Sequence, residues 1–118
     1  MSSIDDGLNQ LLDLDGAKCA ALVDYSSGMV LGSVGTGLDL EVAAGGNTEV
    51  VRAKMKTMQM LGLESTIEDI LITLSDQIHL IRPLSSDREL FLYYVLGGSA
   101  NLALARRKLK QIETDMIV

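Results

Sequence analysis

Few residues of this 118-residue chain have the types and spacing needed for chemistry. The glycine run Gly32–Gly37 invites comparison with a phosphate-binding loop, but such a loop ends in Gly-Lys-Ser or Gly-Lys-Thr, which is absent here. Asp39, which we expect to cap the following helix, would also repel a phosphate at that position. We therefore interpret the glycine run as a flexible connector.

The single histidine and the single cysteine make a zinc site improbable, since such a site needs four ligands or three with an open position. His79 alternates with Ile78 and Leu80, which predicts a surface or half-buried histidine in a strand. Cys19 lies in an apolar strand and is expected to be a small buried side chain. No serine lies in a G-x-S-x-G elbow, and the carboxylates form no pair. We predict no catalytic residue, no metal and no cofactor, and hence a binding module that is not an enzyme.

Composition limits the class of protein further. A length of 118 residues with 47% hydrophobic and 22% charged residues predicts one globular domain spanning residues 1–118. The net charge of −6 argues against nucleic acid as a partner. A lone cysteine favours a reducing, cytoplasmic setting, and the acidic N-terminus predicts neither a signal peptide nor membrane insertion.

The hydrophobic pattern predicts an α+β protein with the order α-β-β-α-β-β-β-α. The expected helices span 4–14, 40–61 and 100–116, and the expected strands span 18–24, 29–34, 67–74, 78–82 and 89–96. Ser2 or Ser3, Asp39 and Ser99 are the expected helix caps. Strands 18–24 and 89–96 are apolar on both faces, so we expect them at the centre of a five-stranded antiparallel sheet. One long helix would cover one face of this sheet and the two terminal helices the other.

The long helix at 40–61 has two apolar faces. One face holds Ala44, Thr48, Val51, Met55 and Met58; the second, about 100° away, holds Ala43, Val50 and Leu61. Two such faces need two neighbours, of which one is the chain's own sheet and the other a further helix, either from this chain or from a second copy. The methionines fit either core filling or an adaptable contact surface. Gly45-Gly46 is the expected point for a bend or a late start of the helix.

The strand at 67–74 suggests how a second copy would bind. If it lies at a sheet edge, its apolar run 70–74 leaves backbone groups unpaired, and pairing with the same strand of a second copy would cover them. The predicted dimer interface comprises Val50, Val51, Met55, Met58, Ile70, Ile72 and Leu74. The basic cluster Arg106, Arg107, Lys108 and Lys110 is interpreted as a solvated helix face, with a docking patch as the alternative.

The sequence as a whole resembles the Roadblock family of dynein light-chain and bacterial GTPase-regulator domains. The resemblance rests on the element order and on LLDLDGAKCAALVDYSSGMVLGS at 11–33, GTGLD at 35–39 and LGGSANLALARRKL at 96–109. It implies a profilin-like Roadblock fold, a homodimer built from the long helices and third strands, and no enzyme activity. The sequence ends at Val118, so we expect no C-terminal tail of the kind that some bacterial members use.

The resemblance also implies a partner, namely a small Ras-like GTPase or a multi-protein signalling or motor complex. In the first hypothesis the dimer binds and regulates the GTPase, with Arg52, Lys54 and Lys56 as candidate contacts at the rim of the paired helices. In the second it is a structural scaffold or light-chain-like subunit that leaves nucleotide turnover unchanged. A third, a small-ligand sensor, is disfavoured because three Tyr, one Phe and no Trp are few residues for holding a planar ligand.

Overall fold

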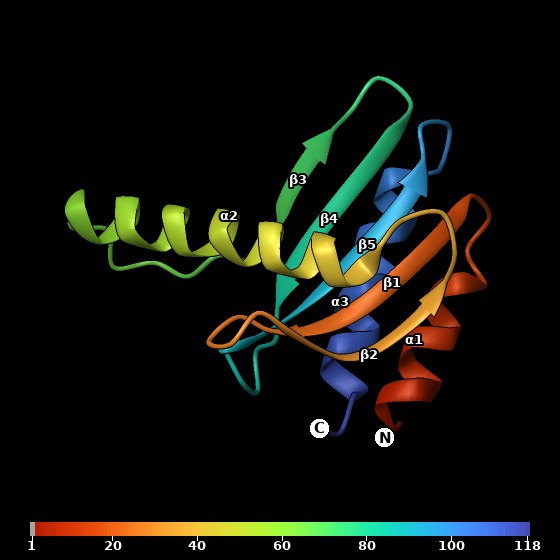
Figure 1. The fold of residues 1–118 in the computed structure, drawn as a ribbon, viewed down its shortest axis with the longest axis horizontal. Helices are drawn as coiled ribbons and strands as arrows, with labels where there is room; N and C mark the ends of the chain where they lie inside the picture. The colour runs from red at the N-terminus through yellow and green to blue at the C-terminus, as the bar shows by residue number, and fades with distance from the viewer. Residues whose placement is uncertain (1) are drawn as a thin grey trace.

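The computed structural model describes residues 2–118 and contains the predicted order of elements (Figure 1). The helices are α1 (Ile4–Leu12), α2 (Leu40–Met60) and α3 (Leu102–Asp115), and the strands are β1 (Ala17–Asp24), β2 (Met29–Gly35), β3 (Ile70–Thr73), β4 (Gln77–Pro83) and β5 (Leu90–Gly97). The strands form one sheet in the order β2-β1-β5-β4-β3, and every pairing is antiparallel. The predicted α+β class is therefore confirmed, as are the central positions of β1 and β5, and β2 and β3 are the two edge strands.

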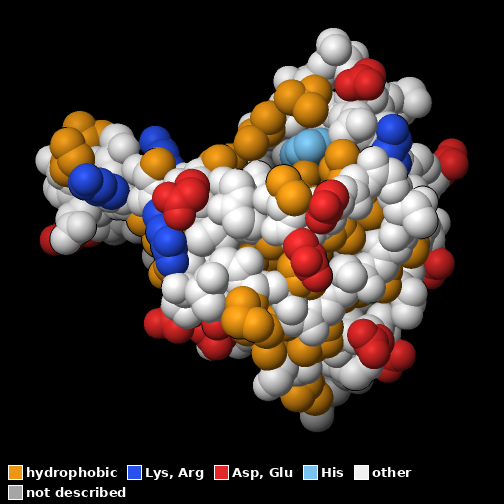
Figure 2. All heavy atoms as spheres, in the orientation of Figure 1, with side chains coloured by type: hydrophobic (Ala, Val, Ile, Leu, Met, Phe, Trp, Pro, Cys, Tyr) orange, Lys and Arg blue, Asp and Glu red, His pale blue; other side chains and the backbone are white. Residues whose placement is uncertain are grey.

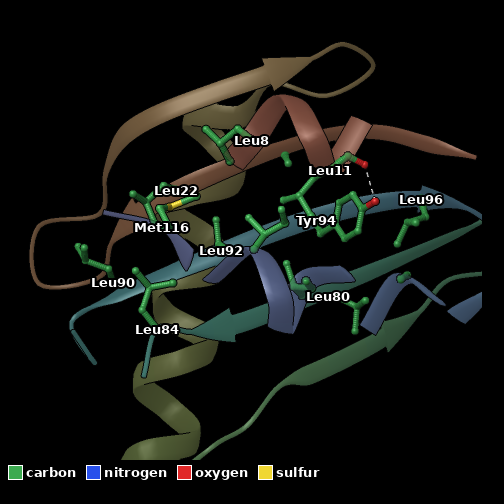
Figure 3. Close-up of a cluster of buried hydrophobic side chains, with 14 of the residues drawn as sticks. Leu8, Leu11, Leu22, Leu80, Leu84, Leu90, Leu92, Tyr94, Leu96 and Met116 are labelled. Atoms are coloured by element: carbon green, nitrogen blue, oxygen red, sulfur yellow. Dashed lines mark hydrogen bonds between the residues drawn. The ribbon is translucent and has the colours of Figure 1, made fainter. Parts of the chain in front are cut away.

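Each face of the sheet has its own core. The face covered by α1 and α3 buries a leucine-rich cluster around Tyr94 (Figure 3). The opposite face, covered by α2, buries Cys19, Ala21, Val23, Ala44, Val51, Ile81, Phe91, Tyr93 and Val95. The two clusters follow from alternation, because successive residues of β1 and β5 point to opposite faces and both faces are covered.

Two helix ends differ from the predicted ones. α1 begins after Ser3, whose hydroxyl accepts from the Asp6 backbone N–H at 3.2 Å, and it ends at Leu12 rather than residue 14. α3 is capped by Asn101 instead of Ser99, because the Asn101 side-chain oxygen accepts from the Leu104 N–H at 3.1 Å. A residue two positions earlier cannot reach that N–H, so the helix starts at Leu102 rather than residue 100.

β3 is four residues long, shorter than the predicted strand 67–74. Its partner β4 ends at Pro83, which has no N–H to continue the ladder. The residues before β3 are held by arginines instead: Arg88 donates to the Ile67 carbonyl at 2.7 Å, and Arg106 binds both carboxylate oxygens of Asp69 at 3.0 and 3.1 Å. Part of the predicted solvated basic face of α3 is therefore a structural ion pair.

α2 runs unbroken from Leu40 to Met60, so the expected bend or late start at Gly45-Gly46 is absent. Asp39 caps the helix as predicted, since its carboxylate accepts from the N–H groups of Glu41 and Val42 at 3.1 and 3.2 Å. The first half of α2 lies over the sheet, whereas its second half extends past the sheet edge (Figure 1). The following segment, residues 61–69, runs back alongside that second half (Figure 1).

The two ends of the chain lie side by side (Figure 1). Ser2 forms a parallel bridge with Met116: its N–H donates to Asp115 at 3.0 Å, and its carbonyl accepts from Ile117 at 2.8 Å. Both ends belong to the layer of α1 and α3. No helix within residues 2–118 is long and apolar enough to cross a membrane.

Candidate interaction surface

Large hydrophobic side chains are exposed along α2 and the segment that follows it. Val42 is 71% exposed and Met60 77% exposed, although both belong to a regular helix with a buried side of its own. Val50, Leu61 and Leu63 are further exposed members of this set. Leu38 is exposed just before α2, and Leu74 is exposed just after β3. Hydrophobic side chains gather over this side of the molecule in Figure 2. Several large exposed hydrophobic side chains on one side of a molecule are typical of a protein-binding site.

A groove of about 410 Å³ separates the first half of α2 from β4 and β5. We call it the α2–β4 groove; it is lined by Leu38, Asp39, Val42, Ala43, Gly46, Asn47, Val50, His79 and Tyr93. Val42, Gly46 and Val50 are spaced by four residues, so they follow one side of the helix. The opposite wall is formed by His79 and Tyr93 on the sheet.

A second hollow, of about 660 Å³, lies beneath the second half of α2. We call it the α2 arm cavity; it is lined by Val50, Lys54, Met58, Leu63, Ser65, Thr66, Ile67, Glu68, Asp69 and Ile70. Val50 lines both hollows, so they form one continuous strip between α2 and the β3 edge of the sheet. This strip is the candidate site.

The glycine pair in α2 has no explanation within one subunit. A Cβ at Gly45 or Gly46 would meet no atom within 4 Å, and neither residue has a positive φ. Glycine inside a helix costs about 1 kcal/mol relative to alanine. Gly46 lies in the α2–β4 groove, where the missing side chain leaves the helix backbone open to close approach by another molecule.

The predicted interface residues do not all lie on this strip. Val50 and Met58 line it, Ile70 lines it at the start of β3, and Leu74 is 44% exposed just beyond β3. Ile72 is half-buried and pairs with His79 across the strands. Val51 and Met55 are different, because they pack into the core under α2, Val51 with no exposed area. A side chain with no exposed area has no surface to offer a partner, so Val51 belongs to the subunit's own core.

The three predicted rim contacts have different surroundings in the structure. The Arg52 guanidinium donates to the carbonyls of Tyr25 and Ser26 at 2.7 and 2.8 Å and pairs with Glu49 at 3.1 Å. It therefore ties α2 to the turn between β1 and β2. Lys54 lines the α2 arm cavity, and Lys56 is exposed.

The groove contains the chain's single histidine, whose side chain is visible beside hydrophobic side chains in Figure 2. Its Nε2 lies 2.9 Å from the Gln77 side-chain oxygen, and its Nδ1 lies 2.9 Å from the Tyr93 hydroxyl. This pattern fits the neutral ring, with Nε2–H donating to Gln77 and Tyr93 donating to Nδ1. Burial lowers the pKa of His79 below its ordinary value, opposed by the Asp76 carboxylate.

Within residues 2–118 no three His, Cys, Asp or Glu side chains come together to hold a metal ion. Burial raises the pKa of the Cys19 thiol, which disfavours the reactive thiolate, and the side chain is fully buried. The expectations for Cys19 as a buried side chain and His79 as a half-buried one are confirmed.

Sequence reasoning missed several residues of the groove, namely Leu38, Val42, Gly46, Asn47, His79 and Tyr93. A signal for the helix side was present in the four-residue spacing of Val42, Gly46 and Val50. No sequence signal pointed to His79 and Tyr93. They lie far from α2 in the sequence, and only the pairing register of the strands brings them to the groove.

This arrangement of helices around the sheet occurs in solved structures. Myxococcus xanthus MglB matches with a TM-score of 0.83 at 18% identity, over 94% of this chain and 89% of that chain. A Roadblock/LC7 domain from Streptomyces avermitilis matches with a TM-score of 0.83 at 14% identity, over 96% of this chain and 93% of that chain. The fold is that of a Roadblock/LC7 domain.

A structure described as MglB with a tetrameric arrangement shares this Roadblock fold, with a TM-score of 0.71 at 19% identity over 94% of this chain and 88% of that chain. No protein-family model and no curated protein sequence matches the chain. The likeness therefore lies in the Roadblock fold, and in this fold the strip between α2 and β3 carries exposed hydrophobic side chains.

Proposed function

We propose that this chain is a cytoplasmic, non-enzymatic Roadblock-family domain, folded as one unit, that forms a homodimer and binds and regulates a small Ras-like GTPase. The observation that carries the proposal is the uncovered apolar strip along α2, which continues to the edge strand β3. The Roadblock fold and the resemblance of the sequence to that family support the same function.

A second copy fits the strip by charge. The first half of α2 carries Asp39, Glu41 and Glu49, whereas the second half carries Arg52, Lys54 and Lys56. Two such helices packed antiparallel bring the acidic half of each beside the basic half of the other, which favours this orientation. A two-fold axis produces the antiparallel arrangement directly.

Gly46 marks the expected crossing point of the two helices. It lies seven residues after Asp39 and eight before Lys54, so a crossing there places Asp39 near Lys54 of the partner subunit. Val42 and Val50, each four residues from Gly46, then face each other across the axis. The bare glycine backbone allows the helices to approach closely, which compensates for its cost in helix stability.

β3 supplies the second element of the proposed dimer. One of its sides pairs with β4, and the other is the edge of the sheet. Its register with Ile81 and His79 places Ile70 and Ile72 on the α2 side. Pairing of two β3 strands would extend the sheet across both subunits and remove an exposed apolar edge.

The glycine pair provides a matched test of the dimer. Gly46→Glu places a carboxylate in the groove, whereas Gly45→Glu places the same group on the other flank of α2, and neither new Cβ meets an atom of the subunit. Sedimentation should show a dimer for the wild-type chain and for Gly45→Glu, and a folded monomer for Gly46→Glu. Persistence of the dimer in Gly46→Glu would place the interface elsewhere.

Regulation of a GTPase is tested separately. The purified dimer is mixed with small Ras-like GTPases of the same organism, loaded with GTP or GDP, and binding and hydrolysis are measured. We expect binding that depends on the nucleotide and a changed hydrolysis rate, and Lys56→Glu should weaken binding because it reverses an exposed positive charge on α2. Binding without any change in hydrolysis would support the scaffold alternative, and no binding to any GTPase would contradict both.

A further inference from the structure

We propose that His79 makes self-association of this chain sensitive to pH, because a second copy seated in the α2–β4 groove encloses an imidazole that must stay neutral. The inference rests on the dimer proposed above. It adds a regulatory property to that interface, with the single histidine of the chain as the titrating group.

The position of His79 supports this role. It pairs with Ile72 of β3 and with Val95 of β5, and it lines the groove opposite Val42 and Val50. The ring lies one strand inward from the β3 edge. A second helix that fills the groove therefore covers the ring with apolar side chains and removes its remaining contact with water.

The hydrogen bonds of the ring fit its neutral form. In the neutral form Nε2–H donates to Gln77 and Nδ1 accepts from the Tyr93 hydroxyl, each at 2.9 Å. The Tyr93 ring stands edge-on to the imidazole, with centroids 5.4 Å apart and planes at 85°. Protonation turns Nδ1 into a donor, so the Tyr93 hydroxyl must turn its own proton away, toward the Asn47 side chain that interacts with it.

The charged groups around the ring are few. Asp76, in the turn between β3 and β4, favours the protonated ring, but burial has the larger effect and lowers the pKa of His79. Asp39 lies in the groove on α2 and Lys54 in the adjoining α2 arm cavity. The Cys19 thiol of β1 lies near Tyr93, and burial raises its pKa, so it remains neutral. The dimer proposed above pairs Asp39 with Lys54 of the partner subunit, which reduces the help that Asp39 gives to a charged ring.

The sign of the pH effect follows from linkage. The pKa of His79 in the free subunit is below its ordinary value of about 6.5, and enclosure in the dimer lowers it further. The affinity between the two copies is therefore highest above the pKa that His79 has in the free subunit. The affinity falls as the pH drops through that pKa toward the lower pKa that His79 has in the dimer. Because a dimer contains two such rings, the dissociation constant rises by up to about 100-fold per pH unit within that window.

Sedimentation equilibrium between pH 7.5 and 5.0 at constant ionic strength tests the proposal with wild type and His79→Gln, a neutral side chain that still forms hydrogen bonds. We expect the wild-type dissociation constant to rise tenfold or more toward pH 5.0, and that of His79→Gln to change less than twofold. Asp76→Asn should shift the wild-type transition to lower pH. Far-UV circular dichroism at both pH limits checks that each protein remains folded.

A second measurement does not depend on a variant. The Hε1 proton of the single histidine gives one NMR signal whose titration reports the pKa of the ring directly, and dilution of the wild-type protein converts dimer to monomer. The pKa should rise on dilution. An unchanged pKa, or a His79→Gln dimer with the pH response of wild type, would overturn the role of His79 alone; a wild-type chain that is monomeric at every pH and concentration would overturn the dimer as well.

Discussion

The hydroxyl of Tyr94 donates a 2.5 Å hydrogen bond to the main-chain carbonyl oxygen of Leu11 (Figure 3), which joins the central strand β5 to the last turn of α1. Both residues are fully buried. The carbonyl of Leu11 is among the last four of α1 and has no partner within the helix. Burial raises the pKa of Tyr94 well above its usual range, so the hydroxyl retains its proton and remains a donor.

Removal of this donor should destabilise the fold. Tyr94→Phe keeps the ring but leaves the Leu11 carbonyl buried without a partner, so we expect a loss of about 1–3 kcal/mol in the free energy of unfolding. Urea denaturation measures the loss. Tyr25→Phe is the matched control, since Tyr25 is half-buried and its hydroxyl forms no hydrogen bond within residues 2–118. Equal losses in the two variants would show that the Tyr94 bond contributes nothing.

Alanine substitutions at two glycines with positive φ should distinguish the cost of backbone strain from the cost of a steric clash. Gly35 has φ +84° and a Cβ there would lie 2.3 Å from the Lys18 carbonyl oxygen, whereas Gly37 has φ +110° and open space around it. Gly37→Ala should cost only the strain of its φ, about 1–2 kcal/mol. Gly35→Ala should cost clearly more, because β2 must also move away from β1. Similar thermal midpoints for the two variants would contradict this reading of the β1–β2 pairing.

The Glu113 carboxylate of α3 is buried and binds two residues outside its own helix. Its side chain is 2% exposed, pairs with Arg82 at 3.3 Å, and accepts from the N–H and hydroxyl of Ser85 at 3.1 and 3.0 Å. Glu113→Ala leaves the Arg82 charge largely buried without its partner, so we expect a loss of about 3–5 kcal/mol on denaturation. Glu49→Ala, at an exposed ion pair, should cost under about 1 kcal/mol. A loss at Glu113 no larger than at Glu49 would refute this role.

The Cys19 thiol should react only after the fold opens. It is fully buried in β1, and burial raises its pKa, which reduces the fraction of thiolate. At pH 8 a disulfide reagent such as DTNB should label the native protein at the rate of unfolding and the urea-denatured protein at once. Fast labelling of the native protein would show that the strand opens far more readily than the packing implies.

The order of helices and strands was predictable because the sequence patterns that indicate each element lie within that element. The two-residue alternation of β1 and β5 and the helical stripe of α3 each lie within one short window of sequence, and burial then determines the layers. The cap at Asp39 was predictable for the same reason. The α3 cap was not, because Asn101 and Ser99 are both good caps and only the path of the chain after β5 selects between them.

Features set by distant residues could not be predicted. The length of β3 depends on Arg88 and Arg106, which bind the residues just before it from 21 and 37 positions away in the sequence. The α2–β4 groove likewise depends on where α2 crosses the sheet. That position is set by contacts between distant parts of the chain, so no short stretch of sequence reveals it. Val50 and Val51 illustrate the problem: they are adjacent and chemically identical, yet one lines the groove and the other lies in the core.

The bridge between Ser2 and Met116 gives this domain a natural site for circular permutation. A short glycine linker could join the two ends without disturbing α2 or β3, because both ends lie with α1 and α3 on the opposite face of the sheet. New ends could then be opened in the exposed turn at Ser75 and Asp76 between β3 and β4. The same geometry means that fusion partners or fluorophores attached at either end would remain clear of the surface along α2.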